Sequence, residues 1–394
     1  MALGIINTLT LAYIVLLKKV NLNELIKNKI VLAFLIFFLI STISLLYALN
    51  PLESITKLTD LFTILIGLII VLFFIRSNYL KKETLLYIIV LSLTIDIILS
   101  SIQYFTIVKR IDFTFEQSNL IRGMYGNKNI AAVSIFLKLI LTQILISTNK
   151  YRYLNYYLLL LNTTSFLILF LLSSRTVFLA IIICFLIFFI SLIIKKFSFK
   201  QTVKNDVKLV SNLIVPLIIA FLFFRFTTYN DNQILVQNRV ASMVEFDGNE
   251  SVSQRLRFYS SAFEYIKTNP LLGCGIGNWR ILSIKYDSED IFSYVVPYFA
   301  HNDFIEVFAE IGLFGLISYI LFFYFIFMVN FKNYILWLKK QANYSHVLLM
   351  FFIISYLIDA NLNFPIDRPA IQSTFLYYLA ILLINTNKKD KNEI

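Results

Sequence analysis

The chain has 394 residues, of which 59% are hydrophobic and 15% are charged, and its formal net charge is +12. Soluble domains carry roughly 45–50% apolar and about 25% charged residues, so this composition excludes an ordinary soluble domain. The basic residues stand mainly between long apolar runs, where the positive-inside rule explains them better than nucleic-acid binding does. We therefore expect membrane lipids, and no nucleic acid, among the partners.

Apolar runs recur along the chain at a length of roughly 18–23 residues, which crosses a ~30 Å hydrocarbon core as a helix. The first run is the weakest, because it is short and carries Asn7, Thr8 and Thr10. The runs predict an all-α polytopic membrane protein with about eleven (10–12) transmembrane helices. The predicted spans are residues 1–17, 30–49, 58–75, 85–107, 129–147, 151–172, 176–194, 209–226, 302–329, 346–364 and 370–386.

The predicted organisation is a single membrane domain overall, made of three parts. Residues 1–226 hold the N-terminal transmembrane helices, residues 227–301 form one large loop containing short helices, and residues 302–394 hold the C-terminal transmembrane helices and a tail. Lys and Arg are concentrated in one alternating set of short loops and in the tail, which predicts that this set is cytoplasmic. The long loop is then extracytoplasmic.

Polar sequence is concentrated on the predicted extracytoplasmic side. Random scatter would not place every unusual polar segment on one face of the membrane, so we interpret this face as the functional one. The segments are residues 123–129, 173–176, 254–279, 301–310 and 363–369.

Cysteine and histidine are too few for a usual four-ligand zinc site. The chain has Cys184 inside a span, Cys274 in a loop, and two histidines, His301 and His346. An acidic cluster in the long loop leaves a Mg²⁺- or Mn²⁺-dependent transferase as an alternative, although such clusters are usually solvated. The cluster consists of Asp287, Glu289 and Asp290.

Several motifs resemble the O-antigen ligase and O-antigen polymerase superfamily of bacterial polytopic membrane glycosyltransferases. The run HNDFIEVFAEIGLFGLISY is similar to its His-Asn helix start, and RLRFYSSAFEYIKTNPLLGCGIGNW is similar to its arginine helix and glycine-asparagine loop. The GNKN segment and the SSRT turn match in order and position, and Tyr259 stands where the family more often has Trp. The resemblance covers residues from about 120 to 370.

This resemblance implies a metal-independent glycosyltransferase, without a cofactor, that uses a polyprenyl-diphosphate-linked glycan as donor. It implies a multi-pass protein of the bacterial inner membrane whose active face is periplasmic. The acceptor is then a hydroxyl of a glycolipid of the lipid A-core type, or another hydroxyl acceptor.

Arginines on this face suit a diphosphate, because guanidinium groups bind phosphate oxygens bidentately and stay charged. Arg175 stands in the SSRT turn between two apolar spans, where a charge costs free energy and therefore indicates a function. The competing interpretation is that Arg175 reaches lipid headgroups. The predicted donor-binding residues are Arg175, Arg255, Arg257 and Arg122.

His301 is the predicted catalytic residue, since a neutral imidazole can accept the proton that the acceptor hydroxyl loses. It stands at a predicted helix start, where the helix dipole disfavours imidazolium. The alternative is a plain helix start capped by Asn302 or Asp303. The predicted supporting or acceptor-binding residues are Asn302, Glu306, Glu310, Asn127, Asn129 and Arg368.

Two further features concern local structure. Asp96 and Lys138 lie midway along neighbouring spans, which predicts a buried ion pair, with an ion path as the alternative. Gly273, Gly275 and Gly277, with Asn278, predict a tight turn where the backbone closely approaches another group.

The leading functional prediction is a ligase that moves a glycan from a polyprenyl diphosphate to a lipid A-core type acceptor. An O-antigen polymerase and a protein O-oligosaccharyltransferase share the donor, base and arginines, so they stay open. A lipid-linked glycan flippase or transporter ranks lower, because it predicts charges along a path across the membrane and inverted repeats.

Overall fold

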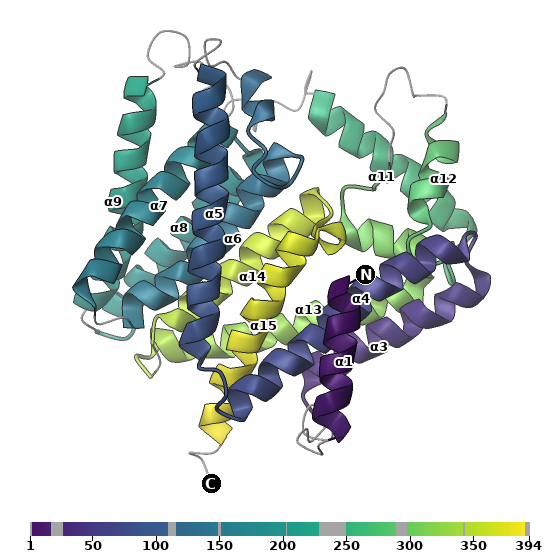
Figure 1. The fold of residues 1–394 in the computed structure, drawn as a ribbon, viewed down its shortest axis with the longest axis horizontal. Coiled ribbons are helices and arrows are strands. Elements are labelled where there is room, and N and C mark those ends of the chain that lie inside the picture. The colour runs from purple at the N-terminus through teal and green to yellow at the C-terminus, as the bar shows by residue number, and fades with distance from the viewer. Residues whose placement is uncertain are drawn as a thin grey trace. The chain divides into compact units, whose positions relative to one another are not determined.

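The structure is a computed structural model of the chain. It describes residues 2–16, 27–108, 116–148, 151–201, 203–227, 250–288, 298–341 and 343–390. Within these ranges the chain forms helices joined by turns, without strands, which confirms the all-α class (Figure 1). The chain divides into two compact units. The boundaries at residues 226 and 301 that the sequence suggested stay a prediction.

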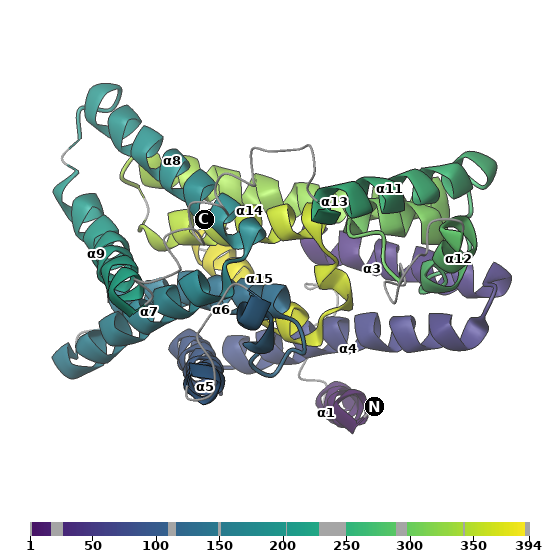
Figure 2. The same ribbon diagram turned by 90° about the horizontal axis from the view of Figure 1, so that it is seen from above.

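Unit 1 comprises residues 1–80, 248–329 and 359–394. Its helix α4 (Pro51–Arg76) packs against α1 (Ala2–Leu16), α3 (Lys29–Ile43) and α15 (Pro369–Asp390). The side chains of Asn28 and Asn50 cap the starts of α3 and α4, each accepting a backbone N–H two residues further on. Figure 2 shows α3 and α4 as an antiparallel pair joined through the 3-10 turn η1 (Ser44–Tyr47).

The same unit contains helix α11 (Glu250–Thr268) and the short helix α12 (Trp279–Tyr286) of the long loop, which pack against each other. The long helix α13 (Asp303–Leu338) follows, and the 3-10 turn η4 (Pro365–Asp367) precedes α15. Aromatic rings join α3, α13 and α15, because Phe34 stacks on Phe322 at 5.1 Å and Phe322 meets Phe375 at 6.1 Å.

Unit 2 comprises residues 81–247 and 330–358. Its helices are α5 (Lys82–Val108), the 3-10 turn η2 (Glu116–Leu120), α6 (Lys128–Thr148), α7 (Arg152–Leu172), α8 (Arg175–Phe197), α9 (Lys204–Thr227) and most of α14 (Ser345–Leu362). Helix α6 is the central one, since nearly all of its described side chains are buried and it packs against α5, α7 and α8.

A buried ion pair joins α5 to α6 inside unit 2. Lys138 Nζ donates to Asp96 Oδ2 at 2.6 Å, and neither residue is more than 4% exposed. Tyr125 donates to the second oxygen of Asp96 at 2.7 Å and accepts from Lys138 at 3.0 Å. The structural interpretation of these two mid-span charges is therefore confirmed.

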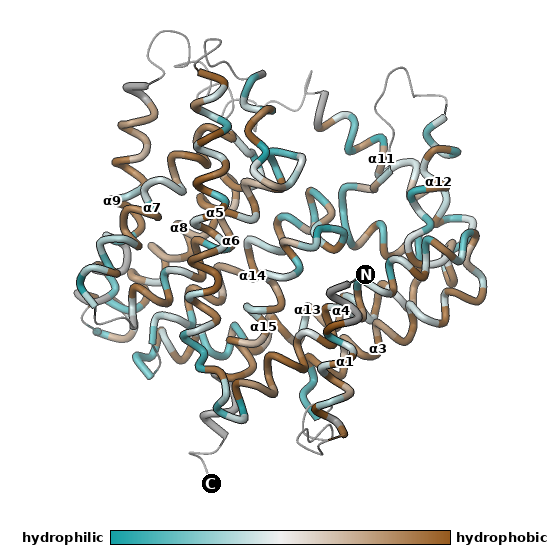
Figure 3. The backbone as a smooth tube through the Cα atoms, in the orientation of Figure 1, coloured by the Kyte–Doolittle hydropathy of each residue, from teal (hydrophilic) through white to brown (hydrophobic). Residues whose placement is uncertain are grey.

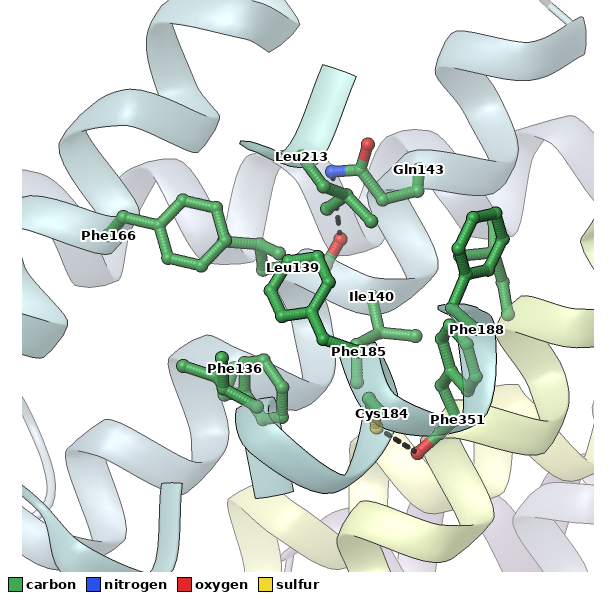
Figure 4. A pocket seen from close by; sticks show the side chains of 12 residues that line it. Phe136, Leu139, Ile140, Gln143, Phe166, Cys184, Phe185, Phe188, Leu213 and Phe351 are labelled. Atoms are coloured by element: carbon green, nitrogen blue, oxygen red, sulfur yellow. Dashed lines mark hydrogen bonds between the residues drawn. The ribbon is translucent and has the colours of Figure 1, made fainter. Parts of the chain in front are cut away.

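An apolar pocket also lies inside unit 2 (Figure 4). Its polar members bond to nearby backbone, because Gln143 donates to the carbonyl of Leu139 and the Cys184 thiol donates to that of Phe351. Aromatic side chains form much of its wall, namely Phe136, Phe166, Phe185, Phe188 and Phe351.

In the part of the chain that the structure describes, eight helices are long and apolar enough to cross a membrane. They lie at residues 29–47, 51–76, 82–108, 128–147, 152–172, 175–197, 303–338 and 345–362, and each coincides with a predicted span. The remaining predicted spans correspond to the 15-residue α1 and to two shorter apolar stretches, Ser211–Phe224 and Pro369–Ile384. Figure 3 shows hydrophobic residues along the bodies of α5 and α9.

Candidate active site

His301 lies directly before α13 with a left-handed backbone (φ 55°). Its ring stacks on Phe258 of α11, with centroids 5.8 Å apart, and meets Phe364 edge-on at 4.9 Å. Its carbonyl accepts a hydrogen bond from the Tyr259 hydroxyl at 3.2 Å. Residues from two other segments of unit 1, α11 and the stretch directly before η4, therefore fix the position of this imidazole.

The imidazole of His301 is neutral at pH 7. Burial lowers its pKa from 6.5 to about 4, with further lowering by the positive charges of Arg255 and Arg368. Its Nδ1 is buried and has no hydrogen-bond partner among the described residues. A neutral imidazole keeps one nitrogen that can accept a proton, so the residue is suited to act as a base.

Arg255 reaches the His301 site from α11. Its Nη2 donates to Asn363 Oδ1 at 3.4 Å, and the amide of Asn363 donates to buried Asp359 at 2.6 Å. Burial lowers the pKa of Arg255. An arginine guanidinium nevertheless stays charged in proteins, and this one makes only a long bond to a neutral amide.

Arg368, the residue directly before α15, is the second arginine whose charge acts on His301. Its guanidinium lies 4.0 Å from the ring centroid of Phe364 and 5.4 Å from that of Phe299. These two rings stack at 4.0 Å. The Nε of Arg368 is buried without a hydrogen-bond partner in the described ranges, so this cation retains donor capacity for an anion.

Arg257 is engaged differently from Arg255. Its Nε lies 2.9 Å from Oδ1 of Asp287, whose side chain is fully buried. Its positive charge is thus already compensated within the 250–288 segment. Its predicted role in donor binding stays a prediction.

Asn302 caps α13, as the alternative interpretation of this helix start expected. Its side-chain oxygen accepts from the backbone N–H of Phe304 at 3.0 Å and of Ile305 at 3.2 Å. Its amide donates to the carbonyl of Asn361 at 3.2 Å, and the Tyr259 hydroxyl oxygen lies 3.1 Å from the same carbonyl oxygen. Asn302 therefore ties the helix that follows His301 to the 359–368 segment.

Glu306 and Glu310 are buried and bind backbone rather than facing solvent. Glu306 accepts from the N–H of Ala300 at 2.9 Å, and Glu310 accepts from the N–H of Trp279 at 3.2 Å. Both interact electrostatically with Lys57 of α4, which forms a salt bridge with Asp367. The two glutamates hold the loops on either side of the site.

The glycine-rich loop binds a break in α13. Ile311 and Gly312 leave helical geometry, and the carbonyls of Ala309 and Glu310 instead accept from the N–H groups of Cys274 and Gly275 at 3.1 and 2.7 Å. A Cβ at Gly312 would lie 2.0 Å from the carbonyl oxygen of Leu271. The predicted close approach of this loop is thus confirmed, with other backbone as its partner.

The remaining predicted residues lie in unit 2. Arg122 is exposed and its Nε donates to the Asn119 carbonyl at 2.7 Å. Asn127 caps α6 by accepting from the N–H of Asn129 at 2.8 Å. Arg175 is the first residue of α8, directly after a turn in which Ser173 is left-handed (φ 49°).

The structure therefore gathers only part of the predicted set within one unit. His301, Asn302 and the two glutamates share unit 1 with three of the arginines, Arg255, Arg257 and Arg368. Sequence reasoning missed Lys57, because a lysine near a span end resembles an ordinary membrane-surface residue. It also missed Phe258 and Phe364, which carry no charge pattern.

No group of three His, Cys, Asp or Glu side chains in the described ranges could hold a metal ion. Asp287 of the alternative acidic cluster pairs with Arg257. Glu289 and Asp290 lie outside the described residues.

The helices and the site define a polytopic membrane protein. Its buried polar groups, among them Glu306, Glu310 and Nδ1 of His301, lie where the long loop meets α13. Residues 160–320 match the family model described as O-Antigen ligase, which confirms the resemblance of the motifs. The match supports a general O-antigen ligase or polymerase type of function in polysaccharide biosynthesis. No curated protein matches the chain.

Proposed function

We propose that this protein transfers a glycan from a polyprenyl-diphosphate donor to an acceptor hydroxyl at the periplasmic face of the bacterial inner membrane. The acceptor is a glycolipid of the lipid A-core type, and the reaction uses neither a metal nor a cofactor. The observation that carries the proposal is the neutral, buried imidazole of His301, on which the charges of two arginines act.

In the proposed reaction His301 accepts the proton of the acceptor hydroxyl as that oxygen attacks the anomeric carbon. The bond between this carbon and the diphosphate oxygen breaks, and its electron pair leaves with the polyprenyl diphosphate. The negative charge that grows on the leaving diphosphate is stabilised by guanidinium groups, which bind phosphate oxygens in a fixed fork geometry.

Arg255 and Arg368 are the arginines whose charges act on His301, which supports their assignment to the diphosphate. Their charges also lower the pKa of His301, so a bound diphosphate that offsets them raises this pKa. The base therefore becomes stronger when the donor is in place. Arg122, Arg175 and Arg257 remain further proposed donor-binding residues, and Asn127 and Asn129 proposed acceptor-binding ones.

The flippase alternative needs charges that line a path across the membrane. Asp96 and Lys138 are paired with each other instead, which favours a transferase. A polymerase and a protein O-oligosaccharyltransferase use the same donor chemistry and are separated by experiment.

The test uses purified protein in nanodiscs, with a labelled polyprenyl-diphosphate glycan and a lipid A-core acceptor, with and without EDTA. His301→Ala lowers turnover by about 10²–10⁴-fold, the usual contribution of a general base. His346→Ala, the matched change at the other histidine, keeps turnover. Full activity in His301→Ala removes the base assignment, and loss of activity in EDTA removes the metal-independent reaction.

A deletion strain separates the acceptor classes. Loss of all glycan-capped lipid identifies the ligase. Retention of caps of a single repeat unit identifies a polymerase, and loss of glycan from protein identifies a protein transferase.

A further inference from the structure

Lys57 is a buried cation of α4 whose neighbours lie far away in the sequence. Its residue is 8% exposed, and its Nζ bonds to Asp367 Oδ1 in the turn η4. It also interacts electrostatically with Glu306 and Glu310 of α13. Lys57 and Asp367 both lie outside the 160–320 range that matches the family model.

The position of Lys57 is fixed by the glycine-rich loop. Ser54, one turn earlier on α4, donates to the carbonyl of Ile276 at 2.6 Å and accepts from Asn278 at 2.8 Å. A Cβ at Gly277 would lie 3.2 Å from Lys57 Cβ. The lysine therefore extends from a packed helix surface rather than from a free loop.

The turn η4 that Lys57 holds leads directly to the His301 site. This turn has two polar attachments, because Asp367 bonds to Lys57 and the N–H of Ile366 donates to Asp303 Oδ2 at 3.2 Å. Phe364 and Arg368 flank the turn on its two sides. Phe364 contacts the His301 ring, and Arg368 lies over Phe364.

We propose that Lys57 is a positioning residue of the active site, which holds η4 through Asp367 so that Arg368 and Phe364 stay against His301. This role deepens the proposed transferase function and rests on it for its effect on turnover. The geometric part stands on its own, because it concerns where Arg368 lies.

The competing role is stability alone. Removing one member of a buried ion pair leaves an uncompensated charge, which destabilises any protein. The two roles differ at His301, because the pKa of this imidazole depends on its burial and on the charges of Arg255 and Arg368. A change at Lys57 therefore reaches the pKa of His301 through η4, by moving Phe364 or Arg368.

The first measurement is NMR of the protein labelled at histidine, in nanodiscs, across pH. The chain has two histidines, and His346→Asn assigns the signals. We expect the His301 pKa to rise from about 4 toward 6.5 in Lys57→Met and to stay at the wild-type value in Lys57→Arg. Lys195→Met is the matched control, because it breaks the buried Lys195–Asp206 pair of unit 2.

The second measurement is turnover together with thermal stability. Lys57→Met lowers turnover by about 100-fold, the scale expected for a displaced catalytic geometry, and Lys57→Arg restores it. The double variant Lys57→Met/Asp367→Asn regains stability because no unpaired charge remains, but it keeps the low turnover and the shifted His301 pKa.

An unshifted His301 pKa in Lys57→Met overturns the proposal, as does a double variant whose turnover recovers together with its stability. A wild-type protein without transferase activity overturns the proposed function instead, and the NMR result still decides whether Lys57 positions Arg368.

Discussion

Two phenylalanines and two arginines surround His301, and together with burial they lower the pKa of its imidazole to about 4. A base with so low a pKa is fully neutral at pH 7, but it has little driving force to accept a proton. In the proposed reaction the anionic donor offsets both arginine charges, so substrate binding and base strength are coupled at this residue. The first test therefore measures how the protonation of His301 depends on pH.

Stability and activity should both report the depressed pKa of His301. Between about pH 4 and 6.5 the unfolded chain binds more protons at this residue than the folded chain, so stability rises with pH and is fully present above about 6.5. His301→Gln should remove this dependence, as measured by thermal unfolding in detergent at stepped pH. The His301 limb of the kcat/KM profile, which reports the free enzyme, should fall near pH 4 rather than 6.5, and a limb at 6.5 in this profile contradicts the assignment.

The buried pair in unit 2 offers a second test at this scale. Lys138→Met leaves Asp96 buried without its cation, and the expected loss is about 3–5 kcal/mol. The double variant Asp96→Asn/Lys138→Met should recover most of it. A double-mutant cycle by chemical unfolding measures the coupling, and additive losses rule out an interacting pair.

The sequence indicated His301 and the Asp96–Lys138 pair because charge is rare in apolar spans. It predicted a neutral His301 from the helix dipole, whereas the structure assigns the neutrality to burial and to two arginines. Lys57 escaped prediction because its partner, Asp367, lies 310 residues away. Contacts of this range depend on packing and leave no local pattern.

At the scale of elements, the site depends on a helix break and the loop that fills it. Helix α13 loses its regular geometry at Ile311 and Gly312, and the N–H of Leu313 turns to the carbonyl of Pro270 at 2.9 Å. The loop's backbone thereby replaces the missing helical hydrogen bonds. Hydropathy predicted an uninterrupted span here, because a helix break whose backbone hydrogen bonds are made by another segment does not change the amino-acid composition of the span.

Gly312→Ala should destabilise the protein strongly, because its new Cβ would collide with the Leu271 carbonyl. Gly126→Ala is the matched control, since Gly126 also has a positive φ (+68°) but nothing within 4 Å of its Cβ. The control should lose only the left-handed backbone cost, about 1–2 kcal/mol. Equal losses in the free energy of unfolding of the two variants, measured by chemical unfolding, would mean that the loop does not pack tightly against α13 at Gly312.

At the scale of the whole molecule, unit 1 is built from both ends of the chain and from the long loop. The family match at residues 160–320 includes His301 and Arg255 but not Lys57, Asp367 or Arg368. The composition predicted the class of the fold, and loop charges predicted its orientation. The grouping of distant segments into one unit could not be predicted, because hydropathy orders helices along the chain and not in space.

Orientation can be tested with single introduced cysteines. Cys184 and Cys274 are both buried, so the wild-type protein should give little background with a membrane-impermeant maleimide. Ser288→Cys in the long loop should be labelled from the periplasm, and Lys340→Cys should be labelled only after the inner membrane is opened. The reverse pattern contradicts the assigned orientation.

The glycine-rich loop also constrains how the protein matures during synthesis. Its partners are the α3–α4 connection, which emerges early, and the break in α13, which emerges after the loop itself. The turn held by Lys57 emerges later still. A nascent chain therefore presents its long loop before Phe364 and Arg368 exist. On the proposed function, the His301 site is completed only when the last helices have been inserted, so a truncated product is inactive.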